Sequence, residues 1–75
     1  MKGLVKQEAL ANVFRQIRIL SGLTQEDMAE ILHVDTRQVR RYETVGTDRL
    51  NVVNNYAEAF KLDSISILSS ALNAY

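Results

Sequence analysis

Apolar side chains recur along this chain at the three- and four-residue spacing of amphipathic helices, and not at the alternating spacing of strands. The first such stripe lies between Glu8 and Leu20. Its members are Leu10, Val13, Phe14, Ile17 and Leu20. Gly22 follows, and glycine readily adopts the left-handed conformation that ends many helices. The pattern therefore predicts a helix over residues 8–20.

A capping motif marks the start of a second, shorter helix. Thr24 is a preferred N-cap residue, and Asp27 stands three positions later, where a capping box places a second polar side chain. We expect the helix that follows to bury one apolar face. That face comprises Met28, Ala29, Ile31 and Leu32.

A third helix is predicted directly after a tight turn at residues 33–34. Asp35 is its expected N-cap, and the helix should end near Thr44. We expect Val39 and Tyr42 on its buried side and three arginines on its exposed side.

Two more helices complete the predicted fold. We expect Thr47 or Asp48 to cap the fourth helix. Its apolar positions are Leu50, Val53, Tyr56, Ala57 and Phe60. A final helical segment begins at Asp63. Its apolar positions are Ile65, Leu68, Ala71, Leu72 and Tyr75. The sequence thus predicts a single compact all-α domain over residues 1–75, with its core at about 8–68.

The second and third predicted helices, within residues 24–43, fit the geometry of a helix-turn-helix. The turn between them is too short for the helices to run antiparallel, so they must cross steeply. Ala29 is small enough to allow a close approach at the crossing. The side chains expected to fill the shared core are Ile31, Leu32, Val34 and Val39. In this motif the second helix enters the major groove of DNA.

This stretch resembles the Cro/C1-type (XRE) helix-turn-helix family, the fold of phage repressors. The resemblance runs from about Phe14 to Leu68. The residues that carry it are Ile17, Arg18, Gly22, Leu23, Thr24, Gln25, Met28, Ala29, Val34, Val39, Tyr42, Glu43, Gly46, Leu50, Ala57 and Leu68. It implies a compact five-helix, lambda-repressor-like domain that binds operator-like double-stranded DNA as a homodimer.

The resemblance also implies roles for single positions. Gln25, the first residue of the second helix, would hydrogen-bond a backbone phosphate and brace the recognition helix. Arg18 and Glu43 would form an ion pair between the first helix and the end of the third. The base-reading candidates on the third helix are Thr36, Arg37, Arg40 and Arg41.

Two residues depart from the family pattern. His33 stands where the family usually has glycine in the turn, and histidine tolerates a positive φ at a cost of about 1–2 kcal/mol. We therefore expect the turn to survive under slight strain. Tyr42 replaces a common tryptophan and still supplies a ring for packing. Neither change removes an expected DNA contact.

Charge is balanced over the whole chain but not along it. Nine Lys and Arg residues offset nine Asp and Glu residues, which gives a formal net charge of zero and a pI near 6.6. Between residues 36 and 49, four arginines stand against two acidic residues, Glu43 and Asp48. This local basic face suits a polyanion, and Arg37 or Arg41 could match guanine O6 and N7. Near the start of the fourth helix, the phosphate-binding candidates are Thr47, Arg49 and Asn51.

The C-terminal segment, residues 64–75, contains no charged residue. The face expected to pack on the core comprises Ile65, Leu68 and Leu72. A second apolar face, formed by Ile67, Ala71 and Tyr75, is expected to meet a second copy of the chain. A two-fold dimer through this segment would place two recognition helices about 34 Å apart, the spacing of successive major grooves.

The sequence favours a DNA-binding regulator of prokaryotic or phage type that acts by occupying an operator. Two alternatives stay open: an antitoxin that binds DNA and a toxin protein, and a protein-interaction module that does not bind DNA. We expect no catalysis, metal or cofactor, because the chain has no cysteine, one histidine and no general base near its serines in sequence. We also expect no membrane span, no small-molecule ligand and a cytoplasmic location.

Overall fold

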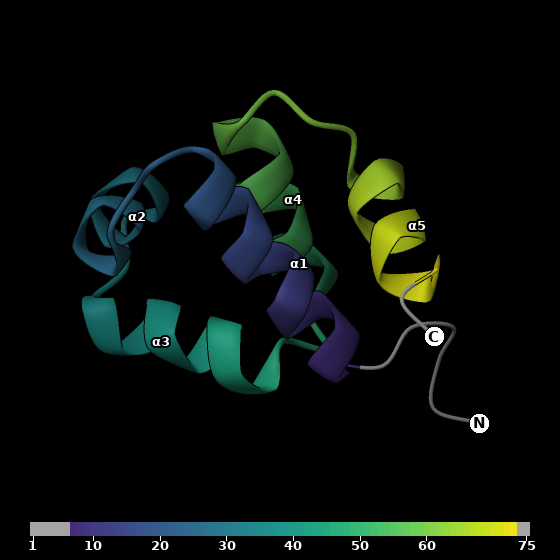
Figure 1. The fold of residues 1–75 in the computed structure, drawn as a ribbon, viewed down its shortest axis with the longest axis horizontal. Coiled ribbons are helices and arrows are strands. Elements are labelled where there is room, and N and C mark those ends of the chain that lie inside the picture. Colours follow the sequence, from purple (N-terminus) through teal and green to yellow (C-terminus); the bar gives the residue numbers. More distant parts are fainter. Residues whose placement is uncertain (1–6, 74–75) are drawn as a thin grey trace.

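Five α-helices make up the described part of the chain, residues 7–73 of a computed structural model, and no strand occurs among these residues. They are α1 Gln7–Leu20, α2 Gln25–Leu32, α3 Thr36–Val45, α4 Leu50–Ala59 and α5 Ser64–Asn73. In Figure 1, α3 runs along one edge of the molecule, and α5 lies at the end away from α2. The predicted all-α fold of five helices is confirmed.

The predicted capping residues fix the starts of α2 and α3. Thr24 Oγ1 accepts a hydrogen bond from the Asp27 N–H at 3.0 Å, and the Asp27 carboxylate accepts one from the Thr24 N–H at 3.0 Å. The bond from the Thr24 backbone is the main reason why the pKa of Asp27 lies below its ordinary value. The Asp35 carboxylate accepts from the Gln38 N–H at 2.8 Å. Both helix starts are therefore determined by bonds within a few residues.

Left-handed backbone follows α1 and α2 at the predicted positions. Gly22 has φ 71°, and His33 has φ 59° and ψ 42°, so His33 occupies the conformation of the glycine that the family usually has. Lys61, after α4, has φ 55° and was not foreseen from the sequence.

The start of α4 differs from the prediction. Arg49 is the N-cap residue and makes no side-chain capping bond, so neither Thr47 nor Asp48 caps the helix. The Thr47 hydroxyl oxygen instead accepts a hydrogen bond from the Arg49 N–H at 3.1 Å. The reason is the conformation of Gly46, the C-cap residue of α3, which has φ 76° and ψ −151°. This extended exit carries the chain away from α3, and α4 begins only at Leu50.

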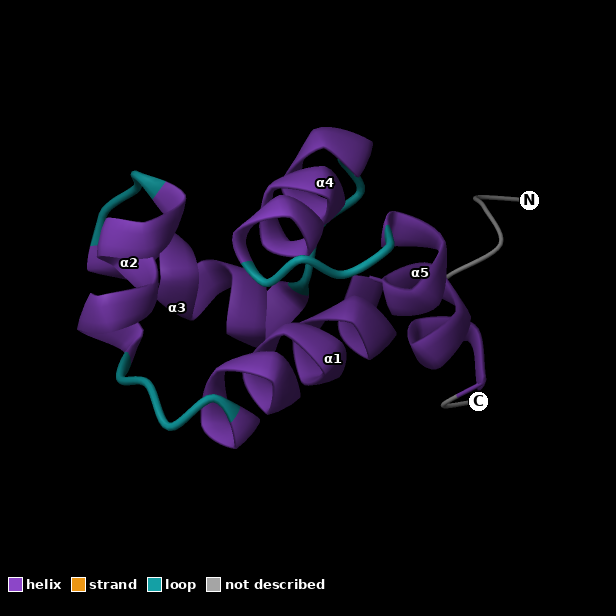
Figure 2. Ribbon diagram, turned by 90° about the horizontal axis from the view of Figure 1, so that it is seen from above, coloured by secondary structure: helices purple, strands orange, loops and turns teal. Residues whose placement is uncertain are grey.

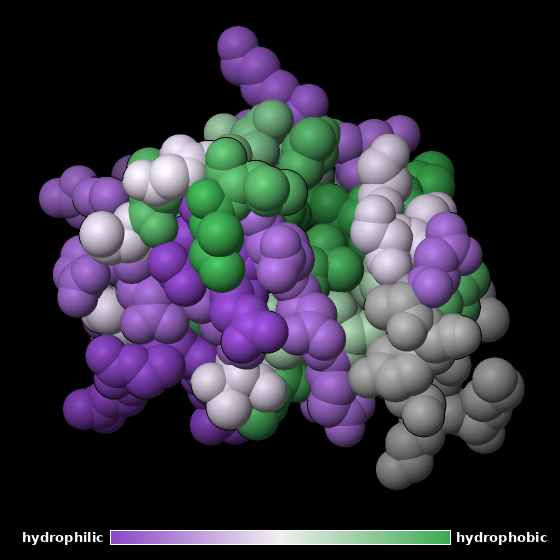
Figure 3. Space-filling model, viewed as in Figure 1, coloured by the Kyte–Doolittle hydropathy of each residue, from purple (hydrophilic) through white to green (hydrophobic). Residues whose placement is uncertain are grey.

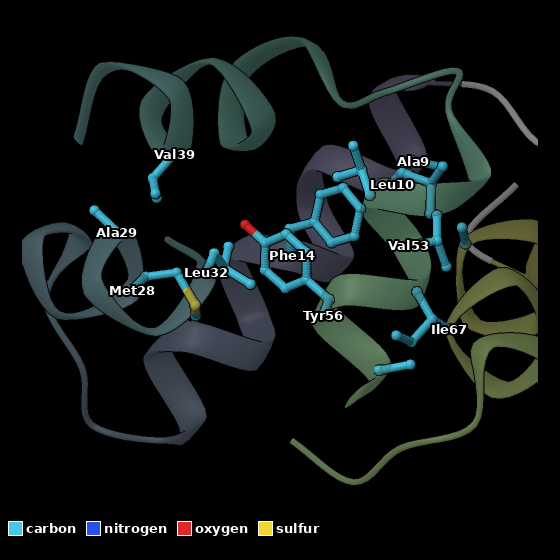
Figure 4. Close-up of a cluster of buried hydrophobic side chains, with 13 residues drawn as sticks. Ala9, Leu10, Phe14, Met28, Ala29, Leu32, Val39, Val53, Tyr56 and Ile67 are labelled. Atoms are coloured by element: carbon cyan, nitrogen blue, oxygen red, sulfur yellow. The ribbon is translucent and has the colours of Figure 1, made fainter. Parts of the chain in front are cut away.

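Side chains from all five helices meet in one hydrophobic core. Its buried members are Ala9, Leu10, Phe14, Met28, Ala29, Leu32, Val39, Val52, Val53, Tyr56, Ala57, Ile67 and Ala71. Phe14 and Tyr56 stack within it, with ring centroids 4.1 Å apart (Figure 4). The Tyr42 ring meets both of them edge-on at 6.3 and 6.2 Å. Tyr42 thus packs as predicted, although its ring is smaller than that of tryptophan.

The Tyr56 hydroxyl is buried without a hydrogen-bond partner among the described residues. Burial also raises the pKa of Tyr56 far above its ordinary value. Tyr56→Phe should raise the free energy of unfolding by about 1 kcal/mol, because the stacked ring stays and an unpaired polar atom leaves the core. Urea denaturation measures this change. A clear loss of stability would mean that the hydroxyl has a partner, such as a buried water.

Three apolar residues of α1, α2 and α4 that were expected in the core are exposed. The exposed fractions are 82% for Leu20, 39% for Ile31 and 59% for Leu50. Leu20 and Leu50 are terminal residues of α1 and α4, where the chain leaves the neighbouring helices. α2 buries Met28 and Leu32, four residues apart, and this orientation turns Ile31 outward. The buried apolar residues of α1 and α4 that the pattern did not identify are Ala9, Ala11 and Val52.

Leu68 of α5 packs against the core as predicted, but the other apolar residues of this helix are reversed. Ile67 and Ala71 are buried, whereas Ile65 and Leu72 are 69% and 51% exposed. α5 packs against α4 and beside the first half of α1 (Figure 2), and Ile67 and Ala71, four residues apart, form the stripe that meets the core. The predicted dimer contact through Ile67 and Ala71 is therefore wrong, because both already fill the core. Tyr75, its third member, lies outside the described residues.

Candidate nucleic-acid interface

α2 and α3 form the predicted helix-turn-helix. A hydrogen bond from the Val34 N–H to the Ala29 carbonyl, 3.0 Å long, closes the turn between them. Ala29, Leu32 and Val39 are buried where the helices meet (Figure 4). Ile31, expected in this shared core, does not take part. The packing holds one side of α3 against α1 and α2 and leaves the opposite side free.

The exposed side of α3 carries arginines and no acidic residue. Arg37, Arg40 and Arg41 are exposed, and Thr36 is half-buried at the start of the helix. Glu43, the one acidic residue of α3, is only 8% exposed. Figure 3 shows hydrophilic side chains gathered over this helix. Positive charge therefore faces solvent along α3, while its carboxylate faces the protein.

Arg18 of α1 holds Glu43 through two charge-assisted hydrogen bonds, as predicted. Arg18 Nε lies 2.7 Å from Glu43 Oε2, and Nη2 lies 3.1 Å from Oε1. Arg18 Nη1 also donates to the Leu23 carbonyl at 3.0 Å. The hydrogen bonds to Glu43 raise the pKa of Arg18, although burial acts in the opposite direction. The pair neutralises Glu43 and ties α3 to α1.

Gln25, the predicted phosphate contact at the start of α2, belongs to the same cluster. Its Nε2 donates to Glu43 Oε1 at 3.2 Å, so one carboxylate links three helices. The side-chain amide of glutamine has two N–H groups, and one of them stays available for a further acceptor. Its role on DNA is still a prediction.

A groove of about 630 Å³ lies between α3 and the first half of α4. Four predicted residues line it, namely Arg41, Thr47, Arg49 and Asn51. The four predicted residues that do not line it are Gln25, Thr36, Arg37 and Arg40. The fold thus brings the candidate phosphate contacts of the α3–α4 loop and of α4 together with one base-reading candidate of α3.

Three amide residues that were not among the predicted contacts also line this groove, and two of them, Gln38 of α3 and Asn55 of α4, each share a helix with a predicted residue; the third is Gln7 of α1. Gln38 precedes Arg41 by three residues, and Asn55 follows Asn51 by four. Residues at these spacings share one face of a helix, so periodicity could have placed each amide beside its predicted neighbour. Only the tertiary fold shows that the two faces line the same groove.

The described residues offer cationic and amide groups at this surface rather than a metal site. Residues 7–73 contain no cluster of three or more His, Cys, Asp or Glu side chains placed to hold a metal ion. None of the helices in this range is long and apolar enough to cross a membrane.

One comparison with known proteins gives a match. A family model described as an antitoxin Xre-like helix-turn-helix domain matches residues 1–59. The matched span ends with the last residue of α4 and therefore includes the whole helix-turn-helix. No curated protein and no solved structure match the chain.

Proposed function

We propose, from the premise that this chain belongs to the antitoxin Xre-like helix-turn-helix family, that it binds double-stranded DNA sequence-specifically and regulates transcription by occupying an operator. Membership confirms the XRE-type resemblance of the sequence and suggests a DNA-binding regulator or an antitoxin. The operator, the regulatory role and the contacts below are our proposal.

The distribution of charge on α3 is the observation that carries this proposal. Its three arginines face solvent, and its one acidic residue is buried against Arg18. A helix that exposes only positive charge, and that a short turn holds across a second helix, suits the major groove of DNA. Arg37 and Arg41 lie four residues apart on one side of α3, and each side chain can match a guanine edge.

Residues outside α3 would contact the phosphate backbone. Gln25 begins α2, and Arg49 and Asn51 stand at the start of α4. Helix starts present free backbone N–H groups and the positive end of the helix dipole, which favour a phosphate. Thr47 would support this contact by fixing the Arg49 backbone through its hydroxyl oxygen.

Selection of bound sequences from random duplex DNA tests the proposal. The protein should enrich a palindrome whose half-sites lie about 10 base pairs apart. Arg37→Ala or Arg41→Ala should weaken binding to the selected sequence at least about fivefold, because a bidentate base contact contributes about 1–3 kcal/mol of discrimination. Binding to random DNA should fall much less.

Arg15→Ala is the matched control for these variants, because Arg15 is exposed on α1 and its hydrogen bond goes to Asn12 of the same helix. If the variant loses the same affinity for selected and for random DNA, the substituted arginine of α3 contacts phosphate only. Absence of any enriched sequence with the unmodified protein would reject the proposal and favour a protein-interaction module.

A homodimer is part of the proposed function. The side of α5 that is left for a second copy carries Ile65 and Leu72, which are exposed. α5 has no charged residue, so two copies could meet there without repulsion between like charges. Sedimentation should show a dimer at micromolar concentration, and Ile65→Lys should shift it to the monomer. A wild-type monomer at high micromolar concentration would contradict the dimer.

An antitoxin is the second candidate function, and the description of the matching family favours it. In this role the chain would bind DNA and also a toxin protein. A toxin-like reading frame beside the gene, whose product binds this chain, would support the antitoxin. DNA binding without such a product supports the regulator alone.

A further inference from the structure

We propose that Gln38 is a further specificity-determining residue, which reads an A·T pair next to the base pair contacted by Arg41; this inference rests on the proposed DNA binding. Gln38 is the third residue of α3. In helix-turn-helix proteins the N-terminal residues of the second helix contact base edges. Gln38 and Arg41 also line the same groove, so they lie on the same side of α3.

The side-chain amide of Gln38 is available for a base edge. Its backbone N–H is held by Asp35 at 2.8 Å, but the side chain makes no hydrogen bond to any residue between 7 and 73. Gln25, by contrast, already donates its amide to Glu43. An amide offers one acceptor oxygen and N–H donors, the combination that matches N6 and N7 of adenine. Arg41 offers donors only, which match guanine.

Helix geometry places Gln38 and Arg41 over neighbouring base pairs. Three residues of α-helix advance about 4.5 Å along the helix axis. Successive bases of one DNA strand are about 3.4 Å apart along the duplex. A helix lying in the major groove would therefore present these two side chains to adjacent pairs. We expect each half-site to contain an A·T pair beside a G·C pair.

The opposite wall of the groove has a different chemistry. It comes from the loop before α4 and from α4 itself, and Arg49 and Asn55 line it. These residues do not belong to the helix-turn-helix, and they would meet the sugar–phosphate backbone, whose contacts carry no direct sequence information. Asp48 also lines the groove, but Arg41 and Arg49 leave a net positive charge there. Gln38 and Asn55 should therefore differ in their effects, although they share one groove.

Selection from random duplex DNA, repeated with single variants, tests this assignment. Gln38→Ala should lose the preference for A·T at one position of each half-site, bind the original sequence about tenfold more weakly, and keep every other preference. Asn55→Ala should weaken binding to all sequences alike. Asn54→Ala should change neither the sequence preference nor the affinity. The Asn54 side-chain oxygen accepts a hydrogen bond from the Ser64 hydroxyl at 2.6 Å, and the residue does not line the groove.

A change of specificity gives the sharper test. Gln38→Arg should convert the preferred A·T pair at that position to G·C, because arginine matches guanine in the same orientation. An unchanged consensus with Gln38→Ala and Gln38→Arg would overturn the assignment, whether or not affinity falls. Failure of the proposed function looks different, since the unmodified protein would then enrich no sequence. Circular dichroism of each variant separates these outcomes from a loss of folding.

Discussion

Gly46→Ala is expected to lower the free energy of unfolding by about 4 kcal/mol, an unusually large loss for one added methyl group. A Cβ on Gly46 would lie 1.8 Å from the carbonyl oxygen of Gln7 and 2.6 Å from its carbonyl carbon. Both are backbone atoms at the start of α1. No side-chain rotation can relieve this contact, so α1 and the end of α3 would have to move apart.

The conformation of Gly46 adds to the cost. Its φ of 76° and ψ of −151° lie in a region that essentially only glycine adopts. This conformation also directs the chain from α3 toward α4, so relaxing it would disturb the groove between them. A domain of this length has a total stability of about 4–11 kcal/mol, and the expected loss is therefore a large part of it.

Urea denaturation followed by circular dichroism measures the change, and Gly22→Ala is the matched control. Gly22 has a similar φ of 71°, but no atom lies within 4 Å of an added Cβ. Gly22→Ala should therefore lose about 1 kcal/mol, from the backbone conformation alone. A Gly46→Ala protein that is largely unfolded, beside a folded Gly22→Ala protein, agrees with the prediction. Similar losses of unfolding free energy in both variants would show that α1 can shift at little cost to accommodate the added methyl group.

The helices of this fold could be predicted where interactions between residues close in sequence determine them. Thr24, Asp27 and Asp35 each bond to backbone or side chain within three residues, and the sequence therefore located the starts of α2 and α3. The faces of α5 depend on where α1 and α4 lie. Because α5 has apolar residues on both sides and no charge, its sequence contains no local sign of which side is buried.

The candidate interface could be predicted in part for the same reason. Helical periodicity alone predicts that the arginines of α3 are exposed. The family resemblance predicts that Glu43 turns inward and pairs with Arg18. The groove could not be predicted, because its walls come from α3, from the α3–α4 loop and from α4, and Gln7 of α1 also lines it. Gln38 and Asn55 became candidates only once these segments were placed together.

Glu43→Ala is expected to cost about 3 kcal/mol of unfolding free energy, at the lower end of the range for breaking a buried ion pair. The substitution leaves the Arg18 guanidinium without its carboxylate and removes the acceptor of Gln25. The Arg18 side chain is 16% exposed, whereas that of Glu43 is 3% exposed. Water can therefore solvate part of the unpaired guanidinium, which limits the loss.

A double-mutant cycle with Arg18→Met tests whether this loss comes from the pair. Arg18→Met alone should also be destabilising, because it leaves the buried Glu43 carboxylate unpaired. The double variant should lose less unfolding free energy than the two single variants together, by at least about 1 kcal/mol. The reason is that its second substitution removes a charge that the first has already left unpaired. Strictly additive losses would contradict the coupling. They would mean that apolar packing around Val39, and not the ion pair, holds the arginine face of α3 in position.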